Sequence, residues 1–233
     1  MSVFGPVMCQ CFGQAEAPMF LAHLRTRDLL ETSDFFPGRW SSCGRTPLGV
    51  AVRTEVMAED GTLLGPRQTG ELVARGDLVC AGYHGGERDT VGSDEWHHTG
   101  DLGWRDEEGF LYIVDRKKDM IVTGGFNVYS VHVEQVVLAH PAGQDCAGVG
   151  GPHGKWGEAV LAVVQLKTGH SVAAEDLVSA VKAQLGNVHA PKQVVFADSL
   201  PRSANGKVLK REIRDRYWLG RERAGGWSAN AAQ

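Results

Sequence analysis

The sequence predicts an α+β protein, in which an antiparallel β-rich N-terminal subdomain is followed by a small α+β domain. Three observations support this fold class. Strand-like alternation and turns fill the first half, helical spacing of apolar residues alternates with short apolar runs in the second half, and a run of five charged residues at 115–119 separates the two. We therefore expect domains at 1–114 and 120–218, and a flexible tail at 219–233.

The first half consists mostly of predicted strands and turns. Residues 50–56 alternate as a half-buried strand does, and the residues on one face are Val50, Val52, Thr54 and Val56. A turn at Asp60-Gly61 leads to a return strand at 71–75, and a further strand is expected at 110–114. Together these segments predict an antiparallel β region.

The second half alternates predicted helices and strands. Apolar residues at helical spacing indicate helices at 131–138 and 176–185, and short apolar runs indicate strands at 159–166 and 193–196. A final helix is expected from an apolar stripe formed by Leu209, Ile213 and Tyr217. This order predicts a domain in which helices pack on a sheet.

Composition excludes several classes of protein. The chain has 233 residues, 42% of them hydrophobic, and a net charge of -4, which is typical of a globular protein and disfavours binding to nucleic acid. No apolar run approaches the ~18 residues of a membrane span, so we expect a cytoplasmic protein. The five cysteines are scattered, and we assign no metal to protein ligands alone.

Three segments have residues suited to chemistry. A carboxylate, Asp101, follows Gly100 and is placed to bind ribose hydroxyls or simply to cap a turn. The pair Gly124-Gly125 permits close approach of a ligand to the backbone, and a plain turn explains it equally well. Lys207 ends a turn-rich loop, from which it could reach a developing phosphate charge or merely face solvent. Residue types alone leave these alternatives open.

Taken in order, five motifs resemble the successive signatures of the adenylate-forming (AMP-binding) superfamily, specifically the C-terminal portion of its acyl-CoA synthetases. They are Phe12-Gly13-Gln14-Ala15-Glu16, Thr99-Gly100-Asp101, Asp115-Arg116-Lys117-Lys118-Asp119, Gly124-Gly125-Phe126-Asn127-Val128-Tyr129, and Pro201-Arg202-Ser203-Ala204-Asn205-Gly206-Lys207. The resemblance runs from about Phe4 to Trp218.

The resemblance implies an acid–thiol ligase. Such enzymes activate a carboxylic acid with ATP to an acyl-adenylate and then transfer the acyl group to CoA, so ATP, Mg²⁺ and CoA are the implied cofactors. Residues 1–114 would be a remnant of the large AMP-binding domain, 115–119 a hinge, and 120–218 the AMP-binding enzyme C-terminal domain. A fatty acid is the default substrate and an aryl acid the main alternative.

The resemblance also implies roles for individual residues on the nucleotide side. Asp101 and Arg116 would hold the ribose hydroxyls of AMP, and Phe12 would stack on adenine. Gly13 and Gln14 belong to the same nucleotide-binding motif. Glu16 would contribute to Mg²⁺ bound on the phosphates.

A second group of roles concerns the change from adenylation to thioester formation. Lys118 would be the hinge residue, and Lys207 would stabilise the charge that develops during adenylation and leave when the domain turns. Gly124 and Gly125 would line the path of the pantetheine arm.

The sequence departs from the family pattern in three ways. Ala15 replaces a threonine whose hydroxyl meets the phosphate, which removes a hydrogen bond to a charged group. Ser130 replaces a proline and is expected to loosen the start of the following helix. The Ser/Thr/Gly-rich phosphate loop that precedes the first motif in full-length members is absent from the sequence, so we expect the chain alone to be inactive.

Three readings of these departures remain. The chain is an incomplete or split ligase that works with a missing N-terminal segment, or a non-catalytic module that binds AMP or CoA or docks on a full-length synthetase, or the product of a misassigned start codon.

Overall fold

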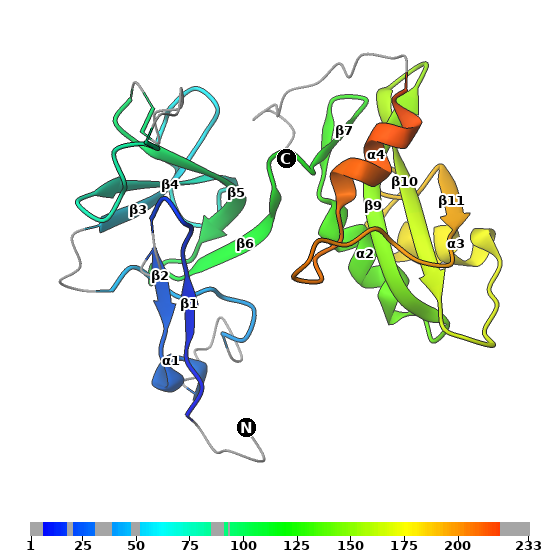
Figure 1. Cartoon of the computed structure of the whole chain (residues 1–233), viewed down its shortest axis with the longest axis horizontal. Helices are drawn as coiled ribbons and strands as arrows, with labels where there is room; N and C mark the ends of the chain where they lie inside the picture. Colours follow the sequence, from blue (N-terminus) through cyan, green and yellow to red (C-terminus); the bar gives the residue numbers. More distant parts are fainter. Residues whose placement is uncertain are drawn as a thin grey trace. The chain divides into compact units, whose positions relative to one another are not determined.

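The computed structural model describes residues 7–17, 21–30, 39–47, 52–84, 91–92 and 94–219. The chain separates into two compact units, unit 1 at 1–114 and unit 2 at 115–233 (Figure 1). The predicted tail beyond 219, and the sequence positions Phe4 and Val50, lie outside the described residues. No helix in the described part of the chain is long and apolar enough to cross a membrane.

Unit 1 is built on a four-stranded sheet with the order β3-β4-β5-β6. Its strands are β3 (Val52–Met57), β4 (Gly70–Gly76), β5 (His97–Arg105) and β6 (Leu111–Arg116). β4 is antiparallel to both β3 and β5. A two-stranded antiparallel sheet of β1 (Gln10–Phe12) and β2 (Ala22–Leu24), with the short helix α1 (Thr26–Leu30), completes the described elements.

A β-bulge interrupts the pairing of β4 with β5. Glu71 pairs with Leu102 and Val73 with His98, so that three residues of β5 face one residue of β4. Gly100 lies within these three and has φ +71°, a value that glycine adopts without steric cost. The sharp bend expected at this glycine is therefore a bulge inside a strand, a device that re-aims neighbouring side chains.

The described residues of unit 2 form a five-stranded mixed sheet and three helices. Its strands are β7 (Ile121–Thr123), β8 (Phe126–Val128), β9 (Gly143–His153), β10 (Gly157–Leu166) and β11 (Gln193–Phe196), and its helices are α2 (Ser130–Ala139), α3 (Ala174–Leu185) and α4 (Lys210–Tyr217). β10 pairs antiparallel with β7 and β9 and parallel with β11. The fold class α+β is thus confirmed.

The central strand β10 is covered on both faces. Val160, Ala162 and Val164 join a cluster with residues of α2 and α3. Leu161 and Val163 alternate with them and join a second cluster with Ile213 of α4. Successive side chains of a strand point to opposite faces, which explains why the run 159–164 is apolar throughout rather than alternating.

Candidate functional site

The first motif folds against the bulge of β5 within unit 1. Gln14 Nε2 donates hydrogen bonds to the Thr99 carbonyl at 2.8 Å and to Asp101 Oδ2 at 3.0 Å. Gln14 Oε1 lies 3.1 Å from His97 Nε2, a hydrogen-bonding distance. The structure thus brings together two motifs that lie more than 80 residues apart, and Gln14 is the residue that joins them.

The bulge itself is fixed by side chains from two strands. Thr99 Oγ1 donates to the Leu72 carbonyl at 2.7 Å and accepts the Asp101 N–H at 3.1 Å. The Gly100 N–H donates to Glu71 Oε1 at 3.0 Å. Asp101 is 3% exposed, so its carboxylate is held by contacts rather than free to rotate. This arrangement offers a preorganised hydrogen-bond acceptor.

Glu16 is positioned by a residue that sequence reasoning missed. Tyr83 donates a hydrogen bond of 2.5 Å from its hydroxyl to Glu16 Oε1, and this bond raises the pKa of Tyr83. No group of three or more His, Cys, Asp or Glu side chains suited to a metal occurs among the described residues. A carboxylate oxygen is a suitable Mg²⁺ ligand, and Mg²⁺ commonly takes one or two carboxylates and completes its shell with phosphates and water. Glu16 fits such a partial role.

The remaining residues of the first motif differ in their surroundings. Phe12 is half-buried and packs against two hydrophobic clusters on the sheet of unit 1. Ala15 is exposed and presents no hydroxyl at the position where the family pattern has one. Gly13 is half-buried.

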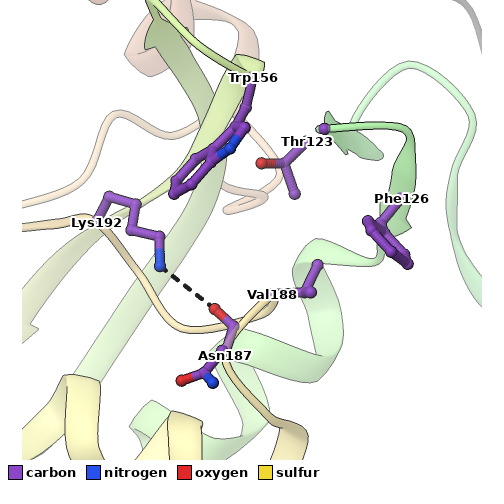
Figure 2. Close-up of a pocket in the computed structure, with 7 residues that line it drawn as sticks. Thr123, Phe126, Trp156, Asn187, Val188 and Lys192 are labelled. Atoms are coloured by element: carbon purple, nitrogen blue, oxygen red, sulfur yellow. Dashed lines mark hydrogen bonds between the residues drawn. The ribbon is translucent and has the colours of Figure 1, made fainter.

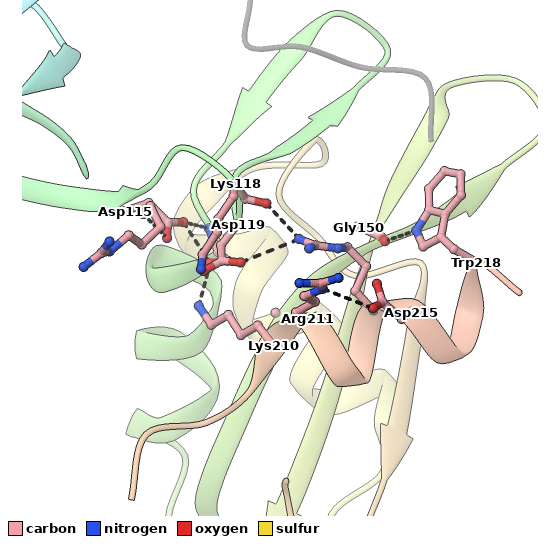
Figure 3. A network of polar contacts seen from close by, with 12 residues as sticks. Asp115, Lys118, Asp119, Gly150, Lys210, Arg211, Asp215 and Trp218 are labelled. Carbon is pink, nitrogen blue, oxygen red and sulfur yellow. Dashed lines mark hydrogen bonds and ion pairs between the residues drawn. The ribbon is translucent and has the colours of Figure 1, made fainter. Parts of the chain in front are cut away.

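The charged run belongs to the start of unit 2. The Asp119 and Met120 N–H groups donate to the Arg116 carbonyl at 2.9 and 3.1 Å, so the run makes a tight turn. The Lys118 carbonyl accepts a hydrogen bond of 2.8 Å from Arg214 Nη1 of α4 (Figure 3). Asp101 lies in unit 1 whereas Arg116 lies in unit 2, so their predicted joint action on a ribose stays a prediction.

The expectation for Ser130 was wrong. This serine is fully buried, and its N–H and hydroxyl donate to Asp115 Oδ2 at 2.6 and 2.8 Å. Asp115 therefore caps the N-terminus of α2, where backbone N–H groups lack partners within the helix. Proline, which has no N–H, could not make this cap, so serine tightens the helix start instead of loosening it.

Lys207 lies in an ordered loop. The Ser203 N–H donates to the Lys207 carbonyl at 2.9 Å, and Gly206 with φ +82° closes the turn. Arg202 donates to the Gly206 carbonyl at 2.5 Å and forms an ion pair with Asp145 of β9. Lys207 itself is exposed, so its side chain is presented from a loop whose backbone is held in place.

A cavity of about 250 Å³ lies beside the glycine pair in unit 2. Gly124 and Gly125 form the two-residue turn between β7 and β8, with φ +57° and +87°. The side chains of Thr123, Trp156 and Lys192 point toward one space (Figure 2). The cavity is lined by Thr123, Gly124, Phe126, Trp156, Asn187, Val188 and Lys192.

The backbone at Gly124, which lines this cavity, favours glycine because its φ is +57°. A Cβ added there would lie 3.4 Å from Trp156 Cδ1, an ordinary van der Waals contact. Trp156 is stacked on His153 with ring centroids 4.3 Å apart, and Lys192 Nζ lies 5.2 Å from a ring centroid of Trp156. The cavity therefore combines an aromatic surface with a cation.

Several lining residues gave no signal in the sequence. Trp156 precedes β10, whose pairing with β7 brings it near the glycine pair. Asn187 and Lys192 come from the loop between α3 and β11, which has no motif. The glycine pair was the one feature that pointed to this place.

Comparison with known proteins supports the family resemblance. Residues 132–207 match the model of the AMP-binding enzyme C-terminal domain. The chain is 43% identical over 232 residues to the medium/long-chain-fatty-acid–CoA ligase FadD8 of Mycobacterium tuberculosis, an alignment that covers 96% of this chain and 39% of that protein.

Two solved structures have the same fold. The amide bond synthetase McbA from Marinactinospora thermotolerans matches with a TM-score of 0.77 and 34% identity over 92% of this chain and 43% of its own. The o-succinylbenzoate CoA synthetase MenE from Bacillus subtilis, in complex with its acyl-adenylate intermediate, matches with a TM-score of 0.76 and 30% identity over 89% of this chain and 41% of its own. The chain thus spans less than half the length of these relatives. It belongs to the adenylate-forming (AMP-binding) superfamily and is similar to the acyl-CoA synthetases within it.

Proposed function

We propose that the chain is part of an acid–thiol ligase that activates a carboxylic acid with ATP and transfers the acyl group to CoA, and that unit 2 supplies the surface on which CoA binds. The cavity beside Gly124 is the observation that carries this proposal. The family resemblance implies that Gly124 and Gly125 line the path of the pantetheine arm, and Gly124 also lines the cavity.

The chemistry of the cavity suits a pantetheine arm. Small-molecule sites usually enclose ~300–1,000 Å³, so a cavity of about 250 Å³ has room for a slender chain rather than for all of CoA. Trp156 and Val188 offer apolar contact, and Thr123 and Asn187 offer hydrogen bonds to amides. Lys192 is a cation at the rim that can pair with a phosphate.

Unit 1 would contribute to the nucleotide side. In this proposal Asp101, held by Gln14, accepts hydrogen bonds from ribose hydroxyls, and Arg116 binds the same hydroxyls. Phe12 would pack on adenine. Mg²⁺, when bound on the phosphates, neutralises their charge, and Glu16 would supply one of its oxygen ligands.

The lysine and the charged run would serve the change between the two half-reactions. Lys207 would place its ammonium near the developing charge of adenylation, and a turn at Lys118 would withdraw it before CoA attacks. The acid is proposed to be a medium- or long-chain fatty acid, because the name of FadD8 specifies that class. An aryl acid such as o-succinylbenzoate, named for MenE, is the alternative.

Titration calorimetry with CoA tests the proposal. We expect CoA to bind to the purified chain, and we expect Trp156→Ala and Lys192→Ala to weaken binding about tenfold or more through loss of an aromatic contact and of a charge pair. Lys182→Ala, a change at an exposed lysine of α3, is the matched control and should bind as the unchanged chain does. Equal affinities for all four proteins, or no binding by a folded chain, would remove this cavity as the CoA site.

A second measurement separates a ligase part from a binding module that does not turn over. The exposed Ala15, with no hydroxyl for a phosphate, favours the module. Acid-dependent exchange of labelled pyrophosphate into ATP is measured over fatty and aryl acids, with Lys207→Ala as control. Exchange that this control abolishes identifies an adenylating chain, and ligand binding without exchange identifies the module or a part that needs a partner segment.

A further inference from the structure

Two sets of polar contacts, here called fastenings, hold the charged run 115–119 to the rest of unit 2, one near each end of the run. Asp115 is bound by Ser130 at one end, and the Lys118 carbonyl is bound by Arg214 at the other. The two fastenings share one element, because Lys210 and Arg214 lie one turn apart on α4. Figure 3 shows this helix beside the run, with Lys210 extending toward Asp115.

The first fastening is a buried polar network. Ser130 holds Asp115 Oδ2 with two donors, and its hydroxyl oxygen accepts a hydrogen bond of 2.7 Å from Lys210 Nζ. Lys210 also pairs with Glu134 Oε1 at 2.7 Å, and that oxygen accepts the Gly148 N–H at 2.7 Å. The side chains of Lys210 and Glu134 are 16% and 13% exposed, so water screens this pair weakly.

The second fastening is a cation on the turn of the run. Arg214 Nη1 donates to the Lys118 carbonyl at 2.8 Å and lies 3.6 Å from Asp119 Oδ1. The side chains of Arg214 and Asp119 are 12% and 13% exposed. A backbone carbonyl held in this way cannot swing freely, so the bond restricts the peptide unit that follows Lys118.

We propose that α4 holds the charged run in place, and that Ser130, Lys210 and Arg214 are positioning residues which keep the predicted hinge residue Lys118 in one conformation. This inference rests on the proposed function. Asp115 precedes Lys118 in the chain and Ser130 follows it. A rotation of the backbone at Lys118 would therefore move Asp115 away from Ser130 and break the hydrogen bonds between them. α4 begins three residues after Lys207, so the same helix links the loop of that lysine to the state of the run.

Limited proteolysis with trypsin measures release of the run directly. Trypsin cleaves after Arg116, Lys117 and Lys118, and a fastened run must be released locally before it fits the protease. Cleavage at 116–118 is quantified by mass spectrometry in native buffer with no nucleotide, acid or CoA present. The assay is therefore independent of CoA binding, and failure of the proposed function leaves its result interpretable.

Two variants at Ser130 weaken the first fastening to different degrees, and one variant at Arg214 removes the second. Ser130→Ala removes the hydroxyl, whereas Ser130→Pro removes both donors and suits the first position of a helix. Tyr129, with ψ 119°, has the extended backbone that a residue before proline requires. Arg214→Met breaks the second fastening, and Arg211→Met is its control because Arg211 pairs only with Asp215 among the ion pairs described for it, at an exposed site.

We expect cleavage at the run to accelerate about tenfold in Ser130→Pro and in Arg214→Met, the factor that corresponds to one charge-assisted hydrogen bond. Ser130→Ala should be intermediate and Arg211→Met unchanged. Hydrogen exchange of β9 and β10 amides should stay as in the unchanged chain, because release is local. Unchanged cleavage in folded Ser130→Pro and Arg214→Met would overturn the proposal, as would equal acceleration of cleavage and of core exchange. If Ser130→Pro does not fold, Ser130→Ala and Arg214→Met decide.

Discussion

Replacing Gln14 by methionine removes the link between the first motif and the bulge of β5. Methionine fills nearly the same volume, so the change deletes hydrogen bonds without leaving a cavity. Asp101, 3% exposed, loses a charge-assisted bond of 3.0 Å, and the Thr99 carbonyl and His97 each lose a neutral one. A bond to a charged group contributes ~1.5–3 kcal/mol and a neutral bond ~1 kcal/mol, so we expect unit 1 to lose about 3.5–5 kcal/mol.

Urea-induced unfolding, with hydrogen exchange of β4 and β5 amides to report unit 1 by itself, measures this loss. Gln68→Met is the matched control, because the Gln68 side chain accepts a hydrogen bond of 2.9 Å from the Gly65 N–H at an exposed turn, and we expect its loss to cost less than about 0.5 kcal/mol. A Gln14→Met protein as stable as this control would refute the view that Gln14 holds Asp101 in place.

Three further predictions concern stability and reactivity. Asp28 is buried and forms two hydrogen bonds of 2.7 Å with Arg25, which lower the pKa of this carboxyl. The stabilisation from the ionised Asp28 is therefore present above the unfolded-state pKa of ~3.9 and lost as pH falls through the lower folded-state pKa. Asp28→Asn should cost about 2 kcal/mol of unfolding free energy at pH 7, allowing for the exposure of Arg25. In unfolding experiments at successively lower pH, the difference in stability between this variant and the unchanged chain should vanish. Gly124→Ala places a side chain at φ +57° and 3.4 Å from Trp156, so we expect a loss of about 1 kcal/mol in urea unfolding together with weaker CoA binding by calorimetry; retention of both properties would contradict the assignment. Burial raises the pKa of the Cys43 and Cys146 thiols to about 12, so iodoacetamide at pH 8 should leave them unmodified in the folded chain. The exposed Cys9 and Cys11 should react, and mass spectrometry would show which cysteines are modified.

The secondary structure of unit 2 could be predicted from the sequence to a large extent. The expected helices at 131–138 and 176–185 are α2 and α3, and the expected strand at 193–196 is β11. β9 was missed, because its apolar residues are interrupted by glycines and by Asp145, which gives neither a helical nor a strand period. β7 and β8 were too short to show a period, and only their two glycines marked the turn between them.

The site could be predicted only in part. The motif residues were visible because they stand in a recognisable order, but their partners were not. Glu71, His97 and Tyr83 contact the motifs from strands and loops far along the chain, and nothing in their local sequence sets them apart. Ser130 was misjudged for the same reason, since its importance depends on Asp115, fifteen residues earlier.

The sequence by itself determined the fold class, the order of the motifs and the family, because these depend on local periodicity and on residues that are neighbours along the chain. The tertiary structure alone decided that Gln14 holds Asp101, that Trp156 and Lys192 face the glycine pair, and that α4 fastens the charged run. Such contacts depend on strand register and on which helix covers which face of a sheet. Those choices are made by the packing of the whole unit, and no short stretch of sequence records them.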